Sequence, residues 1–106
     1  CKGDIGERFS NKDKKFKNIS SSILVKEVIK EIRIKNYGIN NIDINIITES
    51  PRLEKHKKKI LKNISFLCEI LENKINIKAK TTEKLGVIGH EKAIAAEVIV
   101  SIAKYD

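Results

Sequence analysis

The chain has 106 residues, which is enough for one domain, because typical domains contain about 100–150 residues. Hydrophobic residues, mostly Ile, make up 41% of it and charged residues 34%, a balance that excludes an intrinsically disordered chain. The longest apolar region, residues 93–103, is interrupted by Glu97 and is too short for a transmembrane helix, which needs about 20 residues. We therefore expect a single soluble domain over residues 1–106 with no membrane partner.

The formal net charge of +8 favours a partner that carries phosphate groups. Many of the positive charges fall in residues 12–17 and 55–62. The second group lies opposite Ile and Leu residues in a helical pattern, so a solvated helix face explains that run. No set of aromatic residues accompanies the charges to stack on bases. The composition predicts a small phosphate site and no nucleic-acid partner.

We predict a loop for residues 1–19, which contain two glycines and a basic, polar stretch. The three serines that follow, residues 20–22, can accept hydrogen bonds from the free amides of a helix start. A helix that ends near Asn36 is predicted from apolar residues at spacings of three and four, namely Leu24, Val25, Val28, Ile29 and Ile32. Gly38 is expected to close this helix in the left-handed conformation.

Residues 42–46 alternate Ile with Asp or Asn, which predicts a strand with one covered face. Pro51 is expected at the first position of a second helix, where a proline lacks no required hydrogen bond. This helix is predicted to end at Asn73, and its apolar stripe comprises Ile60, Leu61, Ile64, Leu67, Cys68 and Leu71. Cys68 is expected to be a buried thiol, because the two cysteines of the chain indicate neither a metal cluster nor a disulfide framework.

A second half-buried strand is predicted at residues 75–80, where Ile and Ala alternate with polar residues. Residues 93–103 are rich in β-branched residues and almost wholly apolar, which predicts a buried third strand. The order is helix, strand, helix, strand, turn, strand. It indicates an α/β (α+β) fold whose helices pack on one face of a sheet.

The segment KAKTTEKLG, Lys78–Gly86, groups hydroxyl, carboxylate and ammonium groups where a predicted strand ends, a place where ligands collect in α/β proteins. Hydroxyls donate to phosphate oxygens, and a carboxylate can hold a divalent cation that bridges phosphates. Two interpretations remain open. Thr81, Thr82 and Glu83 either bind a phosphate and its cation or form the capped start of a helix.

Two further segments are candidate ligand sites, GDIGERF at Gly3–Phe9 and TESPRLEKH at Thr48–His56. In the first, Asp4 either accepts hydrogen bonds from a diol or stabilises a turn. The second is expected to present a helix N-terminus to an anion or to the polar edge of a base, unless Ser50 only caps that helix. The two histidines of the chain lack companions at metal-ligand spacing and are interpreted as surface residues.

Taken in order, GDIG, NIDINIITESPRL and KAKTTEKLGVIG resemble the motifs of the 2-C-methyl-D-erythritol 2,4-cyclodiphosphate synthase family, from Gly3 to about Lys104. The resemblance implies a homotrimer with active sites between neighbouring subunits, and a role in the non-mevalonate pathway of isoprenoid biosynthesis. The implied enzyme is a metal-dependent phosphorus-oxygen lyase. In its reaction the 2-phosphate of 4-diphosphocytidyl-2-C-methyl-D-erythritol 2-phosphate attacks the β-phosphorus, expels CMP and leaves the cyclic diphosphate.

The resemblance also implies roles for single residues. Thr81 would be catalytic, by stabilising the pentacoordinate transition state, and Glu83 would bind Mg²⁺ or Mn²⁺. Hydroxyls of the sugar parts would contact Asp4, Ile5 and Gly6. A loop over the methylerythritol end would comprise Phe9, Ser10, Asn11, Lys12 and Asp13. The cytidine pocket would comprise Thr48, Glu49, Ser50, Pro51, Arg52, Leu53 and Glu54. The remaining substrate-binding positions would be Lys80, Thr82, Val87 and His90.

The family's zinc ligands, an Asp-x-His pair and a further His, precede the GDIG motif and are not found in this chain. The resemblance therefore implies a domain that is incomplete at its N-terminus, lacks its Zn²⁺ and is inactive alone. Lys80, Val87 and His90 stand where the family usually has a threonine, an aromatic residue and an arginine. The Lys, Asn and Ile bias of the chain is compatible with a bacterial cytoplasm or a plastid-like organelle.

A different hypothesis uses the charge and the alternating helices and strands alone. It describes a basic α/β module that binds nucleotides or RNA without catalysis. A third describes a structural trimer fragment with no activity.

Overall fold

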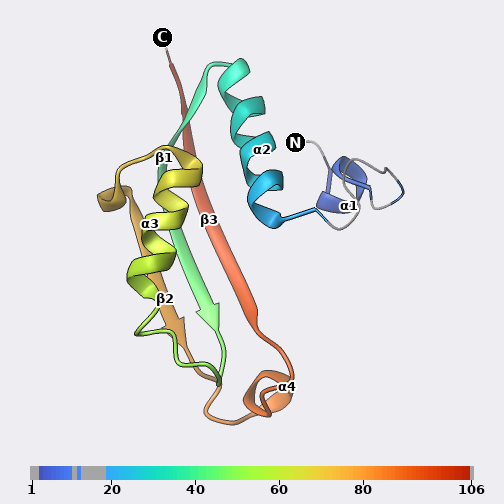
Figure 1. Ribbon diagram of the computed structural model, residues 1–106, viewed down its shortest axis with the longest axis vertical. Helices are drawn as coiled ribbons and strands as arrows, with labels where there is room; N and C mark the ends of the chain where they lie inside the picture. Colours follow the sequence, from blue (N-terminus) through green and yellow to red (C-terminus); the bar gives the residue numbers. More distant parts are fainter. Residues whose placement is uncertain (1–2, 11, 13–18, 106) are drawn as a thin grey trace.

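The computed structural model describes residues 3–10, 12 and 19–105 (Figure 1). From residue 21 onward, helices and strands follow the predicted order, with a short helix in place of the predicted turn. In chain order they are α1 (Ile5–Arg8), α2 (Ser21–Ile34), β1 (Tyr37–Ile47), α3 (Lys57–Cys68), the 3₁₀ turn η1 (Glu72–Lys74), β2 (Ile75–Lys80), α4 (Gly86–Gly89) and β3 (Ala95–Lys104). None of the described helices is long and apolar enough to cross a membrane.

Within the described residues, three strands form one mixed sheet in the order β2-β1-β3. Strand β1 is parallel to β2, with Ile42 opposite Ile75, and antiparallel to β3, with Ile42 opposite Val100. The carboxyl ends of β1 and β2 therefore meet at the same end of the sheet. The loops that follow these two strands contain the second and third sequence motifs, and both lie at the lower end of the molecule in Figure 1.

The core lies between the sheet and the helices α2 and α3. Its most buried side chains, each at most 9% exposed, are Ile42, Ile44 and Ile75 from the strands, Ile29 from α2 and Cys68 from α3. Burial raises the pKa of the Cys68 thiol, while the nearby Arg33 opposes this effect. The predictions of an α+β fold and of a buried Cys68 thiol are confirmed.

A short helix, α1, forms inside the predicted loop of residues 1–19, so the loop prediction is wrong for Ile5–Arg8. Asp4 Oδ1 accepts a hydrogen bond from the Glu7 amide at 2.8 Å, which satisfies one of the amides that a helix start leaves free. Helix α1 lies beside α2 (Figure 1), where Arg8 pairs with Glu31 at 2.9 Å. Asp4 therefore stabilises local backbone, although in a helix rather than in a turn.

The left-handed residue after α2 is Asn36, with φ of 65°, and not Gly38 as predicted. Gly38 lies within β1, which begins at Tyr37 and is longer than the predicted strand. A Cβ atom at position 38 would overlap the Tyr105 hydroxyl. Gly38 therefore leaves room for the Tyr105 side chain, and an asparagine at position 36 tolerates the left-handed conformation.

The second long helix begins later and ends earlier than predicted. Helix α3 starts after His56, whereas Pro51 lies in the preceding loop, so Pro51 is not the first helical residue. The His56 amide donates to the Leu53 carbonyl at 2.8 Å and forms a turn that delays the helix. At the other end Glu69, with φ of 54°, closes the helix before Leu71, which is 69% exposed. A left-handed residue stops the helical hydrogen-bond pattern.

The third strand, β3, overlaps the predicted residues 93–103 and extends one residue beyond them, but it is not buried. Val98, Val100 and Ile102 are about half exposed, and Ile99 is 74% exposed. The reason is the placement of the helices, because α2 packs on β1 and α3 packs on β2. Strand β3 is left as an edge strand with apolar side chains in contact with solvent.

Candidate functional site

The loops after β1 and β2 lie side by side because these strands are parallel neighbours. Ile47 is opposite Lys80 in the strand register, and the Thr48 amide continues the ladder with a 3.0 Å hydrogen bond to the Lys80 carbonyl. The structure thus brings the second motif, around Thr48–Glu54, next to the third motif, around Lys80–Lys84. Sequence separation alone gives no sign of this contact.

Glu49 is the residue that links the two loops. Its Oε1 atom accepts hydrogen bonds from the Thr82 amide at 2.8 Å, the Lys84 amide at 3.0 Å and the Thr82 hydroxyl at 3.2 Å. These contacts stabilise the ionised carboxylate, so the pKa of Glu49 lies below its ordinary value, mainly because of the hydrogen bond from the Lys84 amide. The sequence motifs assigned Glu49 to a cytidine pocket and did not include Lys84. No local sequence pattern indicates a contact between residues 35 positions apart.

The turn that Glu49 contacts has an unusual backbone. Glu83 and Lys84 have φ values of 54° and 66°, so two consecutive residues with side chains adopt the left-handed conformation. That conformation costs roughly 1–2 kcal/mol per residue for an L-amino acid. Such backbone persists only where surrounding contacts hold it, and it is concentrated at functional sites.

Thr81 and Glu83 are both exposed on this turn. Thr81 Oγ1 accepts a hydrogen bond from the Glu83 amide at 3.2 Å, which uses an oxygen lone pair and leaves the hydroxyl hydrogen able to donate to a ligand. The interpretation of this segment as a capped helix start is wrong. Helix α4 begins only at Gly86, after Leu85, and no side chain caps it.

Thr82 is directed into the turn. Its Oγ1 lies 2.7 Å from the Leu85 carbonyl and 3.2 Å from Glu49 Oε1, so its one hydroxyl hydrogen is within reach of two protein acceptors. This arrangement fixes the shape of the turn around Glu83. Whether Thr82 also contacts a substrate stays a prediction.

The loop after β1 is held by its own backbone. Thr48 is 5% exposed, and its hydroxyl donates to the Ser50 carbonyl at 2.9 Å. The Ser50–Pro51 peptide bond is cis. Ser50 does not cap a helix, because His56 precedes α3 and no side chain accepts from its first amides. The expected helix N-terminus is therefore displaced from this loop, and an exposed backbone segment takes its place.

Two residues of the loop after β1 have exposed, charged side chains. Arg52 and Glu54 are exposed, while Leu53 is half-buried. Glu54 pairs with Lys57 at 3.0 Å, at the start of α3. The charges of this loop are thus partly balanced within the loop and the first turn of the helix.

The first motif lies apart from the other two within one chain. Figure 1 places α1, which contains Ile5 and Gly6, beside α2 and away from the loops after β1 and β2. Phe9 is buried, and Ser10 Oγ accepts from the Lys12 amide at 3.1 Å. The predicted loop residues Asn11 and Asp13 lie outside the described residues. The described part of the chain therefore joins two of the three motifs and leaves the first one separate.

Three residues at which the chain departs from the family pattern lie around the turn. Lys80 is exposed at the end of β2, and Val87 is exposed on α4. The His90 ring nitrogen Nδ1 lies 2.6 Å from the Gly86 carbonyl, so this nitrogen carries the proton and donates. His90 thereby stabilises α4 at its end.

A cation could be held here only with help from a ligand. Among residues 3–10, 12 and 19–105, no group of three or more His, Cys, Asp or Glu side chains is placed to hold a metal ion. Mg²⁺ commonly uses one or two carboxylates together with substrate phosphates and water. The exposed Glu83 carboxylate fits that donor set, whereas the described residues do not fit a zinc site, which needs three or four protein ligands.

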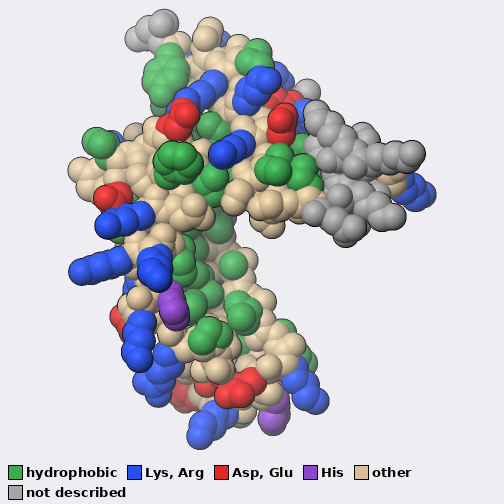
Figure 2. All heavy atoms as spheres, in the orientation of Figure 1, with side chains coloured by type: hydrophobic (Ala, Val, Ile, Leu, Met, Phe, Trp, Pro, Cys, Tyr) green, Lys and Arg blue, Asp and Glu red, His purple; other side chains and the backbone are tan. Residues whose placement is uncertain are grey.

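Charged side chains are distributed unevenly over the surface. Figure 2 shows Lys and Arg side chains over α3 and around the loops at the lower end of the molecule. Lys58, Lys59 and Lys62 are exposed on α3, which confirms that this run is a solvated helix face. The positive charge near the turn favours an anionic ligand.

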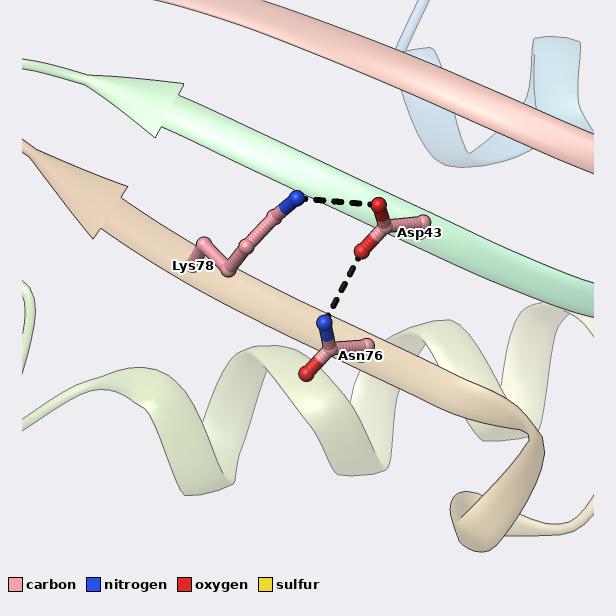
Figure 3. A network of polar contacts seen from close by, with 3 residues as sticks. All are labelled: Asp43, Asn76 and Lys78. Carbon is pink, nitrogen blue, oxygen red and sulfur yellow. Dashed lines mark hydrogen bonds and ion pairs between the residues drawn. The ribbon is translucent and has the colours of Figure 1, made fainter.

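A polar contact on the sheet stabilises the pairing of β1 with β2 (Figure 3). Asp43 accepts hydrogen bonds from Asn76 and from the Lys78 ammonium, each at 2.9 Å. The Lys78 contact is the main reason that the pKa of Asp43 lies below its ordinary value. These residues precede the loops in both strands and keep the two strand ends in register.

A hollow of about 1110 Å³ lies elsewhere, between α2 and α3. Its lining includes Phe66 and Leu71 and the cations of Lys30 and Arg33. It contains no residue of the three motifs, so the strand-end loops remain the candidate site.

The model of the YgbB family matches residues 1–103. The bifunctional enzyme IspD/IspF of Pelagibacter ubique is 62% identical over 104 residues, which are 98% of this chain and 28% of that protein. The 2-C-methyl-D-erythritol 2,4-cyclodiphosphate synthase of Methylobacillus flagellatus is 39% identical over 103 residues, which are 97% of this chain and 64% of that enzyme. The chain thus spans less than two thirds of the length of either relative.

Two solved structures are also similar to this chain. The bifunctional IspDF from Campylobacter jejuni superposes with a TM-score of 0.90 at 38% identity, over 98% of this chain and 28% of that one. The CDP complex of IspF from Plasmodium falciparum superposes with a TM-score of 0.85 at 38% identity, over 98% of this chain and 62% of that one. The match covers all three motifs and the strands and helices that position them. The chain therefore belongs to the YgbB family.

Proposed function

We propose that the protein containing this chain converts 4-diphosphocytidyl-2-C-methyl-D-erythritol 2-phosphate to 2-C-methyl-D-erythritol 2,4-cyclodiphosphate and releases CMP. The observation that carries the proposal is the similarity of 98% of the chain to an IspD/IspF enzyme at 62% identity. This similarity does not favour the alternative of a nucleotide- or RNA-binding module without catalysis.

The reaction is an intramolecular phosphoryl transfer. An oxygen of the 2-phosphate forms a bond to the β-phosphorus, the bond from that phosphorus to the bridging oxygen breaks, and CMP leaves with the electron pair. Because both reacting groups belong to one substrate molecule, the protein mainly has to fold the substrate and stabilise the charge of the transition state. No covalent intermediate with the protein is required.

The two adjoining loops divide these tasks. The Thr48–Glu54 loop binds the cytidine through its exposed backbone, and the turn at Thr81–Glu83 receives the diphosphate. The Thr81 hydroxyl donates to the phosphoryl group as its charge develops. Lys80, at the end of β2, adds positive charge beside it. Val87, on α4, and His90, directly after it, contact the substrate.

Glu83 would hold Mg²⁺ or Mn²⁺, with the substrate phosphates supplying further oxygen ligands. The ion would lower the repulsion between phosphate groups when bound. Zn²⁺ would take its ligands from outside the described residues, and activity would require them. The chain by itself is therefore expected to be inactive.

We propose that the active unit is a homotrimer with its sites between subunits. Asp4, Ile5 and Gly6 are separate from the phosphate turn within one chain, so a site that uses both motifs needs a second copy. The segment Phe9–Asp13 would then cover the methylerythritol end of a substrate bound to the neighbouring copy. The exposed apolar side chains of β3 supply surface for such an assembly.

The proposed location is a bacterial cytoplasm or a plastid-like organelle. Relatives come from bacteria such as Methylobacillus flagellatus, and one from Plasmodium falciparum carries the description apicoplast.

The test is CMP release by the full-length protein, measured with the wild type and with Glu83→Ala. We expect the substitution to lower kcat about 10²–10³-fold, because it removes charge stabilisation at the reacting phosphate. Glu72→Ala is the matched control, since Glu72 lies in η1 away from the strand-end loops, and it should leave kcat within about twofold. Wild-type activity and an unchanged magnesium requirement in Glu83→Ala would contradict the assigned role.

A further inference from the structure

We propose that Glu49 is a positioning residue, whose carboxylate holds the Thr81–Lys84 turn in its reactive shape and joins the cytidine loop to the phosphate turn. The inference rests on the proposed function. It gives Glu49 a task other than contacting cytidine, because the hydrogen bonds of its carboxylate go to the turn.

The first argument is the number of donors that meet one atom. Two backbone amides and one hydroxyl, from Thr82 and Lys84, point to the single oxygen Oε1 of Glu49 at 2.8–3.2 Å. Hydrogen bonds to a charged acceptor are stronger than those between neutral groups. The amides belong to the residues on either side of Glu83, so the carboxylate fixes the backbone before and after the proposed metal ligand.

The second argument is the conformation that these bonds hold. Glu83 and Lys84 both have left-handed backbone conformations. Residues with side chains adopt this conformation rarely, and then usually as single residues rather than two in succession. Successive amides in such a turn converge and form a concave site for an anion. Here a carboxylate of the protein occupies that position. Without it, the turn would relax toward commoner backbone angles and carry the Glu83 side chain with it.

The third argument is that the contact crosses between the two loops. Glu49 follows Thr48, whose amide is paired with Lys80, so the loop after β1 is anchored to the end of β2 immediately before Glu49. The backbone that carries the Glu49 carboxylate is therefore held in place. A displacement of about 1 Å at a reacting group can lower the rate about 10²-fold, so a small loss of position at Thr81 or Glu83 would be measurable.

The experiment uses the full-length protein with three substitutions at one position. Glu49→Ala removes the acceptor, Glu49→Asp withdraws the carboxylate by one methylene, and Glu49→Gln keeps an acceptor oxygen but removes the charge. Steady-state CMP release gives kcat and KM for each variant, Mn²⁺ titration gives the metal dissociation constant, and hydrogen exchange gives the protection of the Thr82 and Lys84 amides. Glu72→Ala serves again as the control.

We expect Glu49→Ala and Glu49→Asp to lower kcat at least about tenfold, while KM changes less than about threefold. Mn²⁺ binding should weaken and the two amides should lose protection. Glu49→Gln should retain more of the wild-type kcat than Glu49→Ala does, because its amide oxygen can accept the same bonds, although without the charge that strengthens them. If Glu49→Ala fails to fold, Glu49→Asp is compared with the wild type in its place.

Three results would overturn the proposal. The first is an unchanged kcat in both Glu49→Ala and Glu49→Asp. The second is an increase in KM without a decrease in kcat, which would indicate a cytidine contact instead. The third is a decrease of kcat in Glu49→Gln as large as in Glu49→Ala. If the wild type releases no CMP, the proposed function fails. Amide protection and Mn²⁺ binding still decide whether Glu49 holds the turn.

Discussion

Single residues at the ends of β1 and β2 carry most of the chemistry proposed for this chain. Thr81 and Glu83 are exposed on a left-handed turn, and one carboxylate, that of Glu49, organises the amides around them. Local pattern indicated the first two residues, because hydroxyl and carboxylate groups cluster after a strand. It could not indicate the part played by Glu49, because its partners lie in a different loop.

The hydrogen bonds to Glu49 predict a pH dependence at the turn. Since they place its folded-state pKa below the unfolded value of about 4.3, the stability they contribute is complete above that pH. It is lost as the pH falls through the folded-state pKa. The amide proton shifts of Thr82 and Lys84, followed by NMR, should therefore be constant from pH 7 to about 5 and change with a midpoint below about 4.3. In Glu49→Gln this transition should be absent, and a midpoint above about 5 in the wild type would contradict the assignment.

At the scale of elements, the central strand β1 decides which parts of the chain meet. Its buried face shares one core with residues of α2 and α3, and its neighbours in the sheet are β2 and β3. The alternating Ile residues of β1 and β2 predicted this burial correctly. Every second side chain of a strand points to the same face of the sheet, so these Ile residues all lie on the face that the helices cover. The boundaries of α3 were predicted less well. A turn at Leu53–His56 delays its start and the left-handed Glu69 ends it, and apolar spacing marks neither point.

Ile44 provides a test of this core. It is 6% exposed at the centre of β1, so Ile44→Ala should remove buried contacts and leave a cavity. We expect the free energy of unfolding to fall by about 2–5 kcal/mol, measured by urea denaturation of the full-length protein. Ile44→Val should cost about 0.5–1.5 kcal/mol. Leu71→Ala, at an exposed position, is the control and should change the value by no more than about 0.5 kcal/mol. Equal losses at positions 44 and 71 would contradict the described core.

At the scale of the whole molecule, the described residues of one chain neither complete the proposed site nor cover the sheet. The GDIG motif lies beside α2, away from the phosphate turn (Figure 1). Strand β3 is an edge strand with exposed apolar side chains. The proposed assembly of copies would account for two separate features, the separation of the first motif from the other two and the exposure of β3. This is the physical reason for the proposed trimer.

Ile99 tests the assembly. It is 74% exposed on β3, so Ile99→Asp should have little effect on an isolated chain but should disrupt an interface, where a carboxylate would lose its water. Light scattering of the full-length protein should show a decrease from about three times the subunit mass toward the mass of one subunit. Leu71→Asp, equally exposed but in the segment before η1, should leave the mass unchanged. A wild type that is monomeric, or an Ile99→Asp variant that assembles normally, would contradict the proposal.

The sequence by itself determined the alternation of helices and strands, the aliphatic core and the three motifs that indicate the family. These features depend on local period and on residue type, which can be read along the chain. The tertiary structure alone decided that Asn36 and not Gly38 is left-handed, that β3 is uncovered, and that Glu49 contacts the phosphate turn. Each of these depends on contacts between distant segments, so no local pattern could specify it.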